Sequence, residues 1–442
     1  MIARAERTSL TRELLGLALP MMLSNLAYTL LGVIDTLYMG RIGTVEVAAV
    51  GLANITVMTL ILFFRGSLNT VTIFVARAFG ANTPEGVRRW YGIFLALALL
   101  AGIPVAALGQ AGLLGILRLF GPEAAVFEAA HTYGAIRLLE APFSMLVSVN
   151  VGFMVALGNS RTPMVLAWTT VAVNALLAWL MIFPLGMGVA GAAWSTVAAL
   201  AVQALLSHLA VARQYGAVYG PLRPLRPTRA ELTSIGRISA PAGLTELAEV
   251  SAFNTFIGVI SRLGAVELAA SNIANQFASF GFMPVFALSA ATGSLVSRYL
   301  GSGNPDASAR VGWRAAGLGM LLMLPLALAF VFIPEPLLRL FTNQDEIIPL
   351  GMQVMRLMAI YQILDGLGII LGGALGGAGD TRFRMLVTVS GAWGIMVPAA
   401  LLLTNAGYGV QGAWGGALIY IMLISLIYAV RFRSGRWRKA TL

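Results

Sequence analysis

The stretch GRIGTVEVAAVGLANI at residues 40–55 decides the fold, because a variant of it, SRLGAVELAASNIANQ, returns at residues 261–276. Matching residues are 221 positions apart, and the same offset continues in both directions along the chain. It pairs Pro20 with Pro241, for example. One constant offset across half of the chain indicates a tandem duplication, so the sequence predicts two copies of one bundle.

The composition indicates a membrane protein. Hydrophobic residues make up 58% of the 442 residues and charged residues only 11%, whereas a soluble domain carries roughly 25% charged residues. There is no cysteine, and the two histidines are far apart in sequence, which argues against thiol chemistry, a zinc site or a Ser-His-Asp triad. The net charge of +11 comes from residues in short loops between apolar stretches. That pattern is typical of membrane topology, not of a nucleic-acid-binding face.

Twelve apolar stretches are long enough to span a membrane, since about 20 residues cross the hydrocarbon core. They lie near residues 14–39, 48–76, 91–115, 130–157, 164–184, 189–212, 235–260, 270–297, 315–333, 348–378, 385–404 and 410–430. The sequence therefore predicts an all-α polytopic membrane protein. Six spans in each copy give both copies the same orientation, so we expect a pseudo-twofold axis along the membrane normal.

We expect a six-helix lobe at residues 1–213, a linker at 214–234 and a second six-helix lobe at 235–442. The linker is rich in proline and arginine and need not fold. Most of the 29 Lys and Arg residues lie in the termini and in the loops on the side of the linker. The positive-inside rule then places both termini in the cytoplasm. The N-terminal segment has no small-residue cleavage site, so we expect it to be retained.

Ionisable residues within the spans are costly, so we expect them to face a water-filled cavity and to serve function. Glu246 and Glu249 share one face of the seventh span because they are three residues apart. Asp365 falls at a similar depth in the tenth span. Converging carboxylates suit a proton or a monovalent cation, and Glu249 and Asp365 are a candidate Na+ site. The alternative is that each acid pairs with a buried arginine or caps a kinked helix.

The first copy carries other polar residues in its spans. Asp35 lies in the first span, and its repeat partner is Phe256, so the copies are expected to share a scaffold and not a site. Arg65, near the middle of the second span, could neutralise an acid or line a cavity. Asn174 in the fifth span is the better cavity candidate among the amides.

Other polar residues are expected to be structural. Glu140 has Arg137 one turn earlier, and a local ion pair explains it. Asn54 and Asn275 occupy matching positions in the two copies, which favours a scaffold role. The glycine-rich run at 372–381 lacks the lysine of a phosphate-binding loop, so we interpret it as close helix packing.

Several motifs together resemble the multidrug and toxic compound extrusion (MATE) transporters. They are VIDTLYMGRIG at 33–43, ARAFGA at 76–81, GNSRTP at 158–163 and GVAGAAWST at 188–196. The resemblance covers essentially the whole chain. It implies a V-shaped pair of six-helix lobes around a central cavity, and export of organic cations in exchange for H+ or Na+.

The resemblance also implies roles for individual residues. Asp35 falls on the first-helix aspartate of the family, and Glu249 and Asp365 fall on the acids of its NorM-like branch. Asp365 lies in the stretch YQILDG, which begins with Tyr361. We expect Tyr361 to be a binding residue as well. Asn174 matches an asparagine of the proton network in DinF-like members, which carry an aspartate one turn later where this chain has alanine. The sequence around Arg65 also looks DinF-like, so the coupling ion is left open between H+ and Na+.

We therefore expect a multi-pass antiporter of the inner membrane that works by rocker-switch alternating access. It would export small amphipathic or cationic organic compounds, act as a monomer among membrane lipids and need no cofactor. The main alternative is a flippase for lipid-linked or polysaccharide precursors, whose cavity would need several arginines for phosphate, whereas only Arg65 lies well inside a span. An intramembrane enzyme lacks any catalytic motif, and a passive channel would not explain the asymmetric acids.

Overall fold

The computed structural model describes residues 2–439, with the side chains of residues 10–439, and the regular secondary structure in that range is helical. The helices are α1 (Ile2–Gly40), α2 (Thr44–Asn69), α3 (Val71–Gly80), α4 (Pro84–Phe120), α5 (Ala124–Arg137), α6 (Ala141–Ala156), α7 (Arg161–Ile182), α8 (Gly188–Tyr219), α9 (Arg229–Ser261), α10 (Ala265–Gly301), α11 (Pro305–Phe332), α12 (Pro334–Arg339), α13 (Ile347–Gly377), α14 (Thr381–Gly391), α15 (Val397–Leu403) and α16 (Gly409–Arg433). Short 3₁₀ turns lie at Leu138–Glu140 and Arg436–Lys439, and π-helical segments at Ala392–Met396 and Thr404–Tyr408.

Ten helical segments of the described chain are long and apolar enough to cross a membrane. One of them, Thr381–Arg433, contains two passes, because the chain turns at Gly407 (φ 92°) and α15 packs against α16. The remaining predicted span is α9, whose 33 residues are long enough but whose Glu246 and Glu249 reduce its hydropathy. The prediction of an all-helical polytopic membrane protein is confirmed.

The repeated stretch forms the same turn in both copies. Gly43 precedes α2 and Gly264 precedes α10. In each case the glutamate three residues later folds its carboxylate back against the glycine, so closely that a Cβ atom there would collide with it. A carboxylate at a helix N-terminus is stabilised by the helix dipole. The spacing of glycine and glutamate therefore recurs because both copies use the same helix start.

The described chain forms two compact units. The N-terminal unit consists of residues 20–243, and the C-terminal unit of residues 244–439 together with residues 2–19. Both α1 and α9 therefore begin in one unit and end in the other. The divisions fall next to Pro20 and Pro241, where proline removes a helical hydrogen bond.

Specific contacts hold the first part of each of these helices. In the C-terminal unit, Glu13 of α1 accepts hydrogen bonds from Arg298 (3.0 Å) and from the Tyr299 hydroxyl (2.7 Å). In the N-terminal unit, the hydroxyls of Ser239 on α9 and Thr70 lie 2.6 Å apart. Each copy of the repeat thus contributes its first helical stretch to the unit that the other copy builds.

The connector between α8 and α9, residues 220–228, packs on α4. The Leu225 amide donates to the Gly92 carbonyl at 2.9 Å, and the Leu222 side chain is buried. A Cβ atom at Gly92 would lie 2.7 Å from the Arg223 carbonyl oxygen. The absence of a side chain at Gly92 therefore lets the connector backbone approach the helix.

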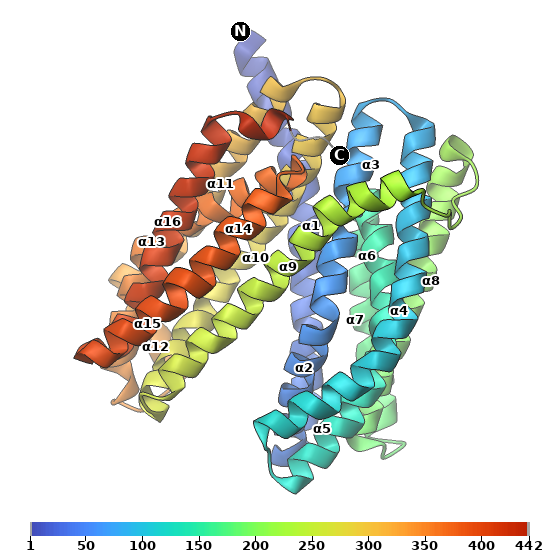
Figure 1. The fold of residues 1–442 in the computed structure, drawn as a ribbon. Coiled ribbons are helices and arrows are strands. Elements are labelled where there is room, and N and C mark those ends of the chain that lie inside the picture. The colour runs from blue at the N-terminus through green and yellow to red at the C-terminus, as the bar shows by residue number, and fades with distance from the viewer. Residues whose placement is uncertain (1, 440–442) are drawn as a thin grey trace. The chain divides into compact units, whose positions relative to one another are not determined.

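Helix α13 is the centre of the C-terminal unit, with α10, α11 and α16 packed around it (Figure 1). Glycines of the run at 372–381 make its contact with α10. A Cβ atom at Gly377 would collide with the backbone of Gly293, and one at Gly293 would lie 2.9 Å from the Gly373 carbonyl oxygen. The prediction that this run serves close helix packing is confirmed.

Candidate functional site

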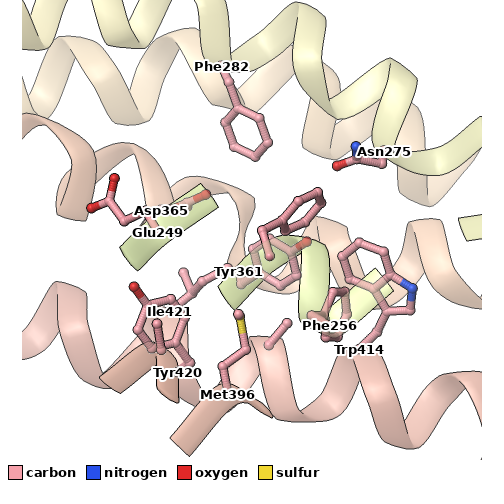
Figure 2. A pocket seen from close by; sticks show the side chains of 13 residues that line it. Glu249, Phe256, Asn275, Phe282, Tyr361, Asp365, Met396, Trp414, Tyr420 and Ile421 are labelled. Carbon is pink, nitrogen blue, oxygen red and sulfur yellow. The ribbon is translucent and has the colours of Figure 1, made fainter. Parts of the chain in front are cut away.

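A cavity lies within the C-terminal unit among α9, α10, α13, α16 and the π-helical segment Ala392–Met396 (Figure 2). It has two adjoining chambers of about 220 Å³ each. We call them the aromatic chamber and the arginine chamber. Both are lined by Glu249, Phe282, Asp365, Tyr420 and Ile421. Each chamber is somewhat smaller than typical sites for drug-like molecules, which have volumes of roughly 300–1,000 Å³.

Fixed aromatic rings form the walls of the aromatic chamber. The rings of Phe256 and Trp414 meet edge to face, with centroids 5.0 Å apart and an interplanar angle of 82°. The Trp414 indole nitrogen donates to the Ser271 hydroxyl at 3.0 Å, which fixes the plane of the indole. Tyr361 and Phe282 complete this part of the lining. Aromatic faces held in this way are able to bind a flat apolar molecule or an organic cation.

Glu249 from α9 and Asp365 from α13 lie together at one end of the cavity, away from Trp414 and Asn275 (Figure 2). Tyr361 is one turn before Asp365 on the same face of α13, which explains why both reach the cavity. Within residues 10–439, the Asp365 carboxylate makes neither a hydrogen bond nor an ion pair, and no third His, Asp or Glu joins the two acids in a metal-holding group.

Glu249 has a basic neighbour. Its Oε1 atom lies 3.8 Å from Nη2 of Arg384, a residue of α14 that lines the arginine chamber. The Glu249 side chain is 41% exposed, so water reaches it. The sequence is compatible with two roles for Glu249, a cation ligand or the partner of a buried arginine. The nearby Arg384 supports the second role, and the exposure of the carboxylate leaves the first possible.

The π-helical segment shapes one wall of the aromatic chamber, because Ala392 and Met396 at its two ends line it. Pro398 follows shortly after, and proline cannot donate the backbone hydrogen bond to Gly394 that a regular helix requires. The wider turn accommodates this loss. The repeat partner of Pro398 is Leu177, and the first copy has a regular helix there.

A second polar cluster lies in the N-terminal unit. Thr196 donates to Asp35 Oδ2 at 3.3 Å, and Asn174 Nδ2 donates to Thr196 Oγ1 at 3.1 Å. All three side chains are buried. Two acceptor atoms, Asp35 Oδ1 and Asn174 Oδ1, have no hydrogen-bond partner among the described residues. The structure thus brings Asp35 and Asn174 together, in a different unit from Glu249 and Asp365.

Two predicted site residues lie outside these sites. Glu246 is half-buried and lines neither chamber, and the Arg65 side chain is exposed and makes no ion pair with a described residue. Among the residues predicted to be structural, Glu140 pairs with Arg137, whose Nε lies 3.0 Å from the carboxylate. That prediction is confirmed.

The matching asparagines differ in their roles. Asn54 accepts a hydrogen bond from Tyr133 at 3.2 Å, which fits the predicted scaffold role. Asn275 instead lines the aromatic chamber, so a scaffold role alone does not describe it. The helix positions correspond, but the aromatic chamber exists around only one of the two asparagines.

Sequence reasoning missed Thr196, Arg384 and Trp414. Thr196 ends the GVAGAAWST motif, so its place in the sequence was noted but not its contact with Asp35. Arg384 is the fourth residue of α14, and from the sequence it belongs only to the basic residues near the ends of the spans. Its repeat partner is Pro163, and this asymmetry was the available signal. For Trp414, no sequence feature other than its aromatic side chain indicated a place in the cavity.

Comparison with known proteins gives a consistent result. The MatE family model matches residues 20–180 and 241–402, once in each copy. A probable multidrug resistance protein NorM from Thermotoga maritima is 28% identical, over 99% of this chain and 95% of its own length. Its counterpart from Deinococcus radiodurans is 30% identical, over 97% of both chains. A solved structure of MATE in the bent conformation has a TM-score of 0.89 at 21% identity and covers 98% of this chain and 97% of its own. That structural match bears on the fold alone.

Proposed function

Since the chain belongs to the MatE family, we propose that it is a secondary active antiporter that exports small amphipathic or cationic organic compounds in exchange for H+ or Na+. Both named relatives are described as multidrug resistance proteins, and no part of the proposal requires an enzymatic step or a cofactor. The observation that supports it best is the position of Glu249 and Asp365 beside the rings of the aromatic chamber.

In this proposal the two acids bind either the coupling ion or the charge of the substrate. A cation in the aromatic chamber gains from the rings and from the nearby carboxylates. A proton or Na+ on Glu249 or Asp365 removes that attraction, so ion and substrate disfavour each other. This reciprocity is the condition for exchange by alternating access. Two carboxylates without further ligands suit one monovalent ion, with water completing its coordination.

We propose that Asp35, Asn174 and Thr196 form a second ion site. The two orphaned acceptor oxygens of this cluster are costly when buried. A proton on Asp35 would supply a donor, and Na+ would be bound by both oxygens, so the cluster fits either ion. We assign no direct contact with ion or substrate to Arg65 or Glu246. Glu246 would act only through its charge, which lies within electrostatic range of Arg384.

The flippase alternative ranks lower. A cavity for lipid-linked phosphate needs an excess of basic groups. Among the described residues, the two chambers contain the acids Glu249 and Asp365 and the single base Arg384. The acidic excess favours a cationic substrate.

We further propose that the chain acts as a monomer in the inner membrane with both termini in the cytoplasm. The natural chain has no cysteine, so single cysteines can be labelled without background. Leu185, which is 62% exposed, and the exposed Asn405 replaced by cysteine should react from outside intact cells. A cysteine at the exposed Pro224 of the connector should react only after permeabilisation. The reverse pattern would overturn the orientation.

The function itself is tested by reconstitution. Proteoliposomes containing the purified chain would be loaded with a fluorescent organic cation and given either a proton or a sodium gradient. Efflux driven by one of these gradients, and lost in Glu249→Gln and Asp365→Asn, is the expected result. Unchanged efflux in both variants, or efflux that needs no ion gradient, would count against an antiporter that uses these acids.

A further inference from the structure

Arg384 is built into the wall of the arginine chamber. The Tyr428 hydroxyl donates to the Arg384 carbonyl at 3.3 Å and lies 2.6 Å from the Thr388 hydroxyl, so α16 holds this turn of α14. The guanidinium lies against α13 where that helix has glycines. A Cβ atom at Gly376 would lie 3.4 Å from Nη1, and one at Gly372 would lie 3.9 Å from Nε.

The acid nearest to Arg384 along its own helix is already occupied. Asp380, at the start of α14, accepts a hydrogen bond from Arg431 at 2.8 Å. Arg384 instead extends into the cavity, where Nη2 lies 3.8 Å from Glu249 Oε1. This separation is longer than a charge-assisted hydrogen bond of about 2.7–2.9 Å. The pair is therefore loose, and the water-accessible Glu249 keeps room for a competing cation.

The charged groups facing the arginine chamber can be counted element by element. Helix α9 contributes Glu249, α13 contributes Asp365 and α14 contributes Arg384, while the lining residues of α10 carry no charge. The tyrosines of α16 are neutral at physiological pH. Glu246 is within range of Arg384 but lines neither chamber. With both lining acids ionised, the lining carries two negative charges and one positive charge.

We propose that Arg384 is a tethered counter-charge that leaves the Glu249–Asp365 site with one net negative charge, so that the site binds one monovalent cation and not two, and not a divalent cation. This inference rests on the proposed function of the two acids. The inference adds to that proposed function the net charge of the site and a residue, Arg384, that sets this charge. Arg384 neutralises part of the field at Glu249 without filling the chamber, because its guanidinium stays against the glycine face of α13.

The test measures how ions displace a bound organic cation. Tetraphenylphosphonium is bound to the full-length protein in nanodiscs, and the half-displacing concentrations of H+, Na+ and Mg²⁺ are determined. Neutralising Arg384 in Arg384→Gln or Arg384→Met should lower the half-displacing concentration of H+ or Na+ about tenfold, as removal of a nearby opposite charge implies. Mg²⁺, which is expected to be inert towards the natural chain at millimolar concentration, should become a competitor.

Three control variants test whether the effect comes from the charge of Arg384. Arg384→Lys retains the charge and should behave like the natural chain. The exposed Arg382, two residues away, makes no ion pair with a described residue, so Arg382→Gln should change nothing. Glu246→Gln should change displacement less than the neutral Arg384 variants do, because Glu246 lines neither chamber.

The outcomes separate this inference from the proposed function. If Glu249→Gln and Asp365→Asn leave ion displacement unchanged, the acids are not the coupling site and the proposed function fails. If those variants abolish displacement but both neutral Arg384 variants match the natural chain, only the tethered counter-charge is wrong. It is equally wrong if Arg384→Lys shifts displacement as far as Arg384→Gln, or if neither neutral variant folds, because Arg384 is then structural.

Discussion

The Arg89 guanidinium binds the Glu231 carboxylate side-on, with Nε 2.8 Å from Oε1 and Nη2 2.8 Å from Oε2. The same carboxylate accepts hydrogen bonds from the Thr228 amide (2.7 Å) and hydroxyl (2.8 Å), and the Glu231 amide donates back to Thr228 at 3.3 Å. This is a capping box at the start of α9. It fixes the beginning of the second copy to α4.

This arrangement predicts an acid-sensitive contribution to stability. The hydrogen bond from Arg89, with those from Thr228, lowers the pKa of Glu231 to about 2. Because the folded value is depressed, the contribution is complete above the ordinary pKa of about 4.5 and is lost as pH falls towards 2. Arg89 is 37% exposed, so solvent screening limits the effect. We expect Glu231→Gln to cost about 1 kcal/mol at pH 7, measured by thermal unfolding in detergent.

The control is the exposed pair of Glu335 and Arg339, whose side chains are 48% and 46% exposed. Glu335→Gln should leave the free energy of unfolding within about 0.5 kcal/mol of the natural value. An identical acid dependence of unfolding in Glu231→Gln and the natural chain would contradict the assignment.

The packing of the connector against α4 can be tested by a substitution at Gly92. A Cβ atom there would lie 2.7 Å from the Arg223 carbonyl oxygen and 2.8 Å from Leu225 Cδ1. Gly92→Ala should therefore displace the connector, cost about 1–3 kcal/mol and increase protease cleavage between residues 220 and 228. Gly236 on α9 has no atom within 4 Å of its Cβ position, and Gly236→Ala should be stabilising by about 0.5–1 kcal/mol. Equal proteolysis of the two variants would mean that the connector is not held at Gly92.

The fold was predictable because its determinants are spread over long stretches. Twenty apolar residues in succession predict a span without knowledge of its neighbours. A constant offset likewise predicts a repeat from the sequence alone. Asp35, Glu249 and Asp365 could be selected as candidate site residues from the sequence, because charge in an apolar span is costly wherever the helix lies.

Other features depend on how the helices pack. The contribution of residues 2–19 to the unit of the second copy includes the contacts of Glu13, an ordinary acid in sequence. Arg384 lies near a helix end, where an arginine is expected to extend towards water. It extends towards Glu249 instead because glycines of α13 leave room beside it. No property of the isolated stretch GDTRFR indicates that direction.

The polar cluster of the N-terminal unit predicts an unusual mutational effect. Asp35→Asn removes a buried charge, and its amide supplies a donor where Asp35 Oδ1 and Asn174 Oδ1 both lack one. We expect the free energy of unfolding to stay equal or to rise by about 1 kcal/mol, while the effect of pH or Na+ on substrate binding weakens. The measurements are thermal unfolding and tetraphenylphosphonium binding across pH.

Glu140 provides the contrasting case. It is buried and paired with Arg137, so Glu140→Gln removes the ion-pair partner of a buried arginine and should cost about 3 kcal/mol. If Asp35→Asn is as destabilising as Glu140→Gln, Asp35 is held by a partner and is not poised to take up an ion.

The aromatic chamber makes the last prediction, which concerns Trp414. Its indole is fixed by Ser271 (3.0 Å) and by edge-to-face contact with Phe256. Trp414→Leu removes the aromatic face and should weaken tetraphenylphosphonium binding about tenfold, equivalent to about 1.4 kcal/mol. Trp414→Phe keeps a ring but loses the hydrogen bond and should weaken binding about threefold. Trp179 in the N-terminal unit is 50% exposed, and Trp179→Leu should bind normally. Equal affinities in all three variants would place the substrate elsewhere, because a chamber that binds organic cations through its rings cannot lose its largest ring without losing affinity.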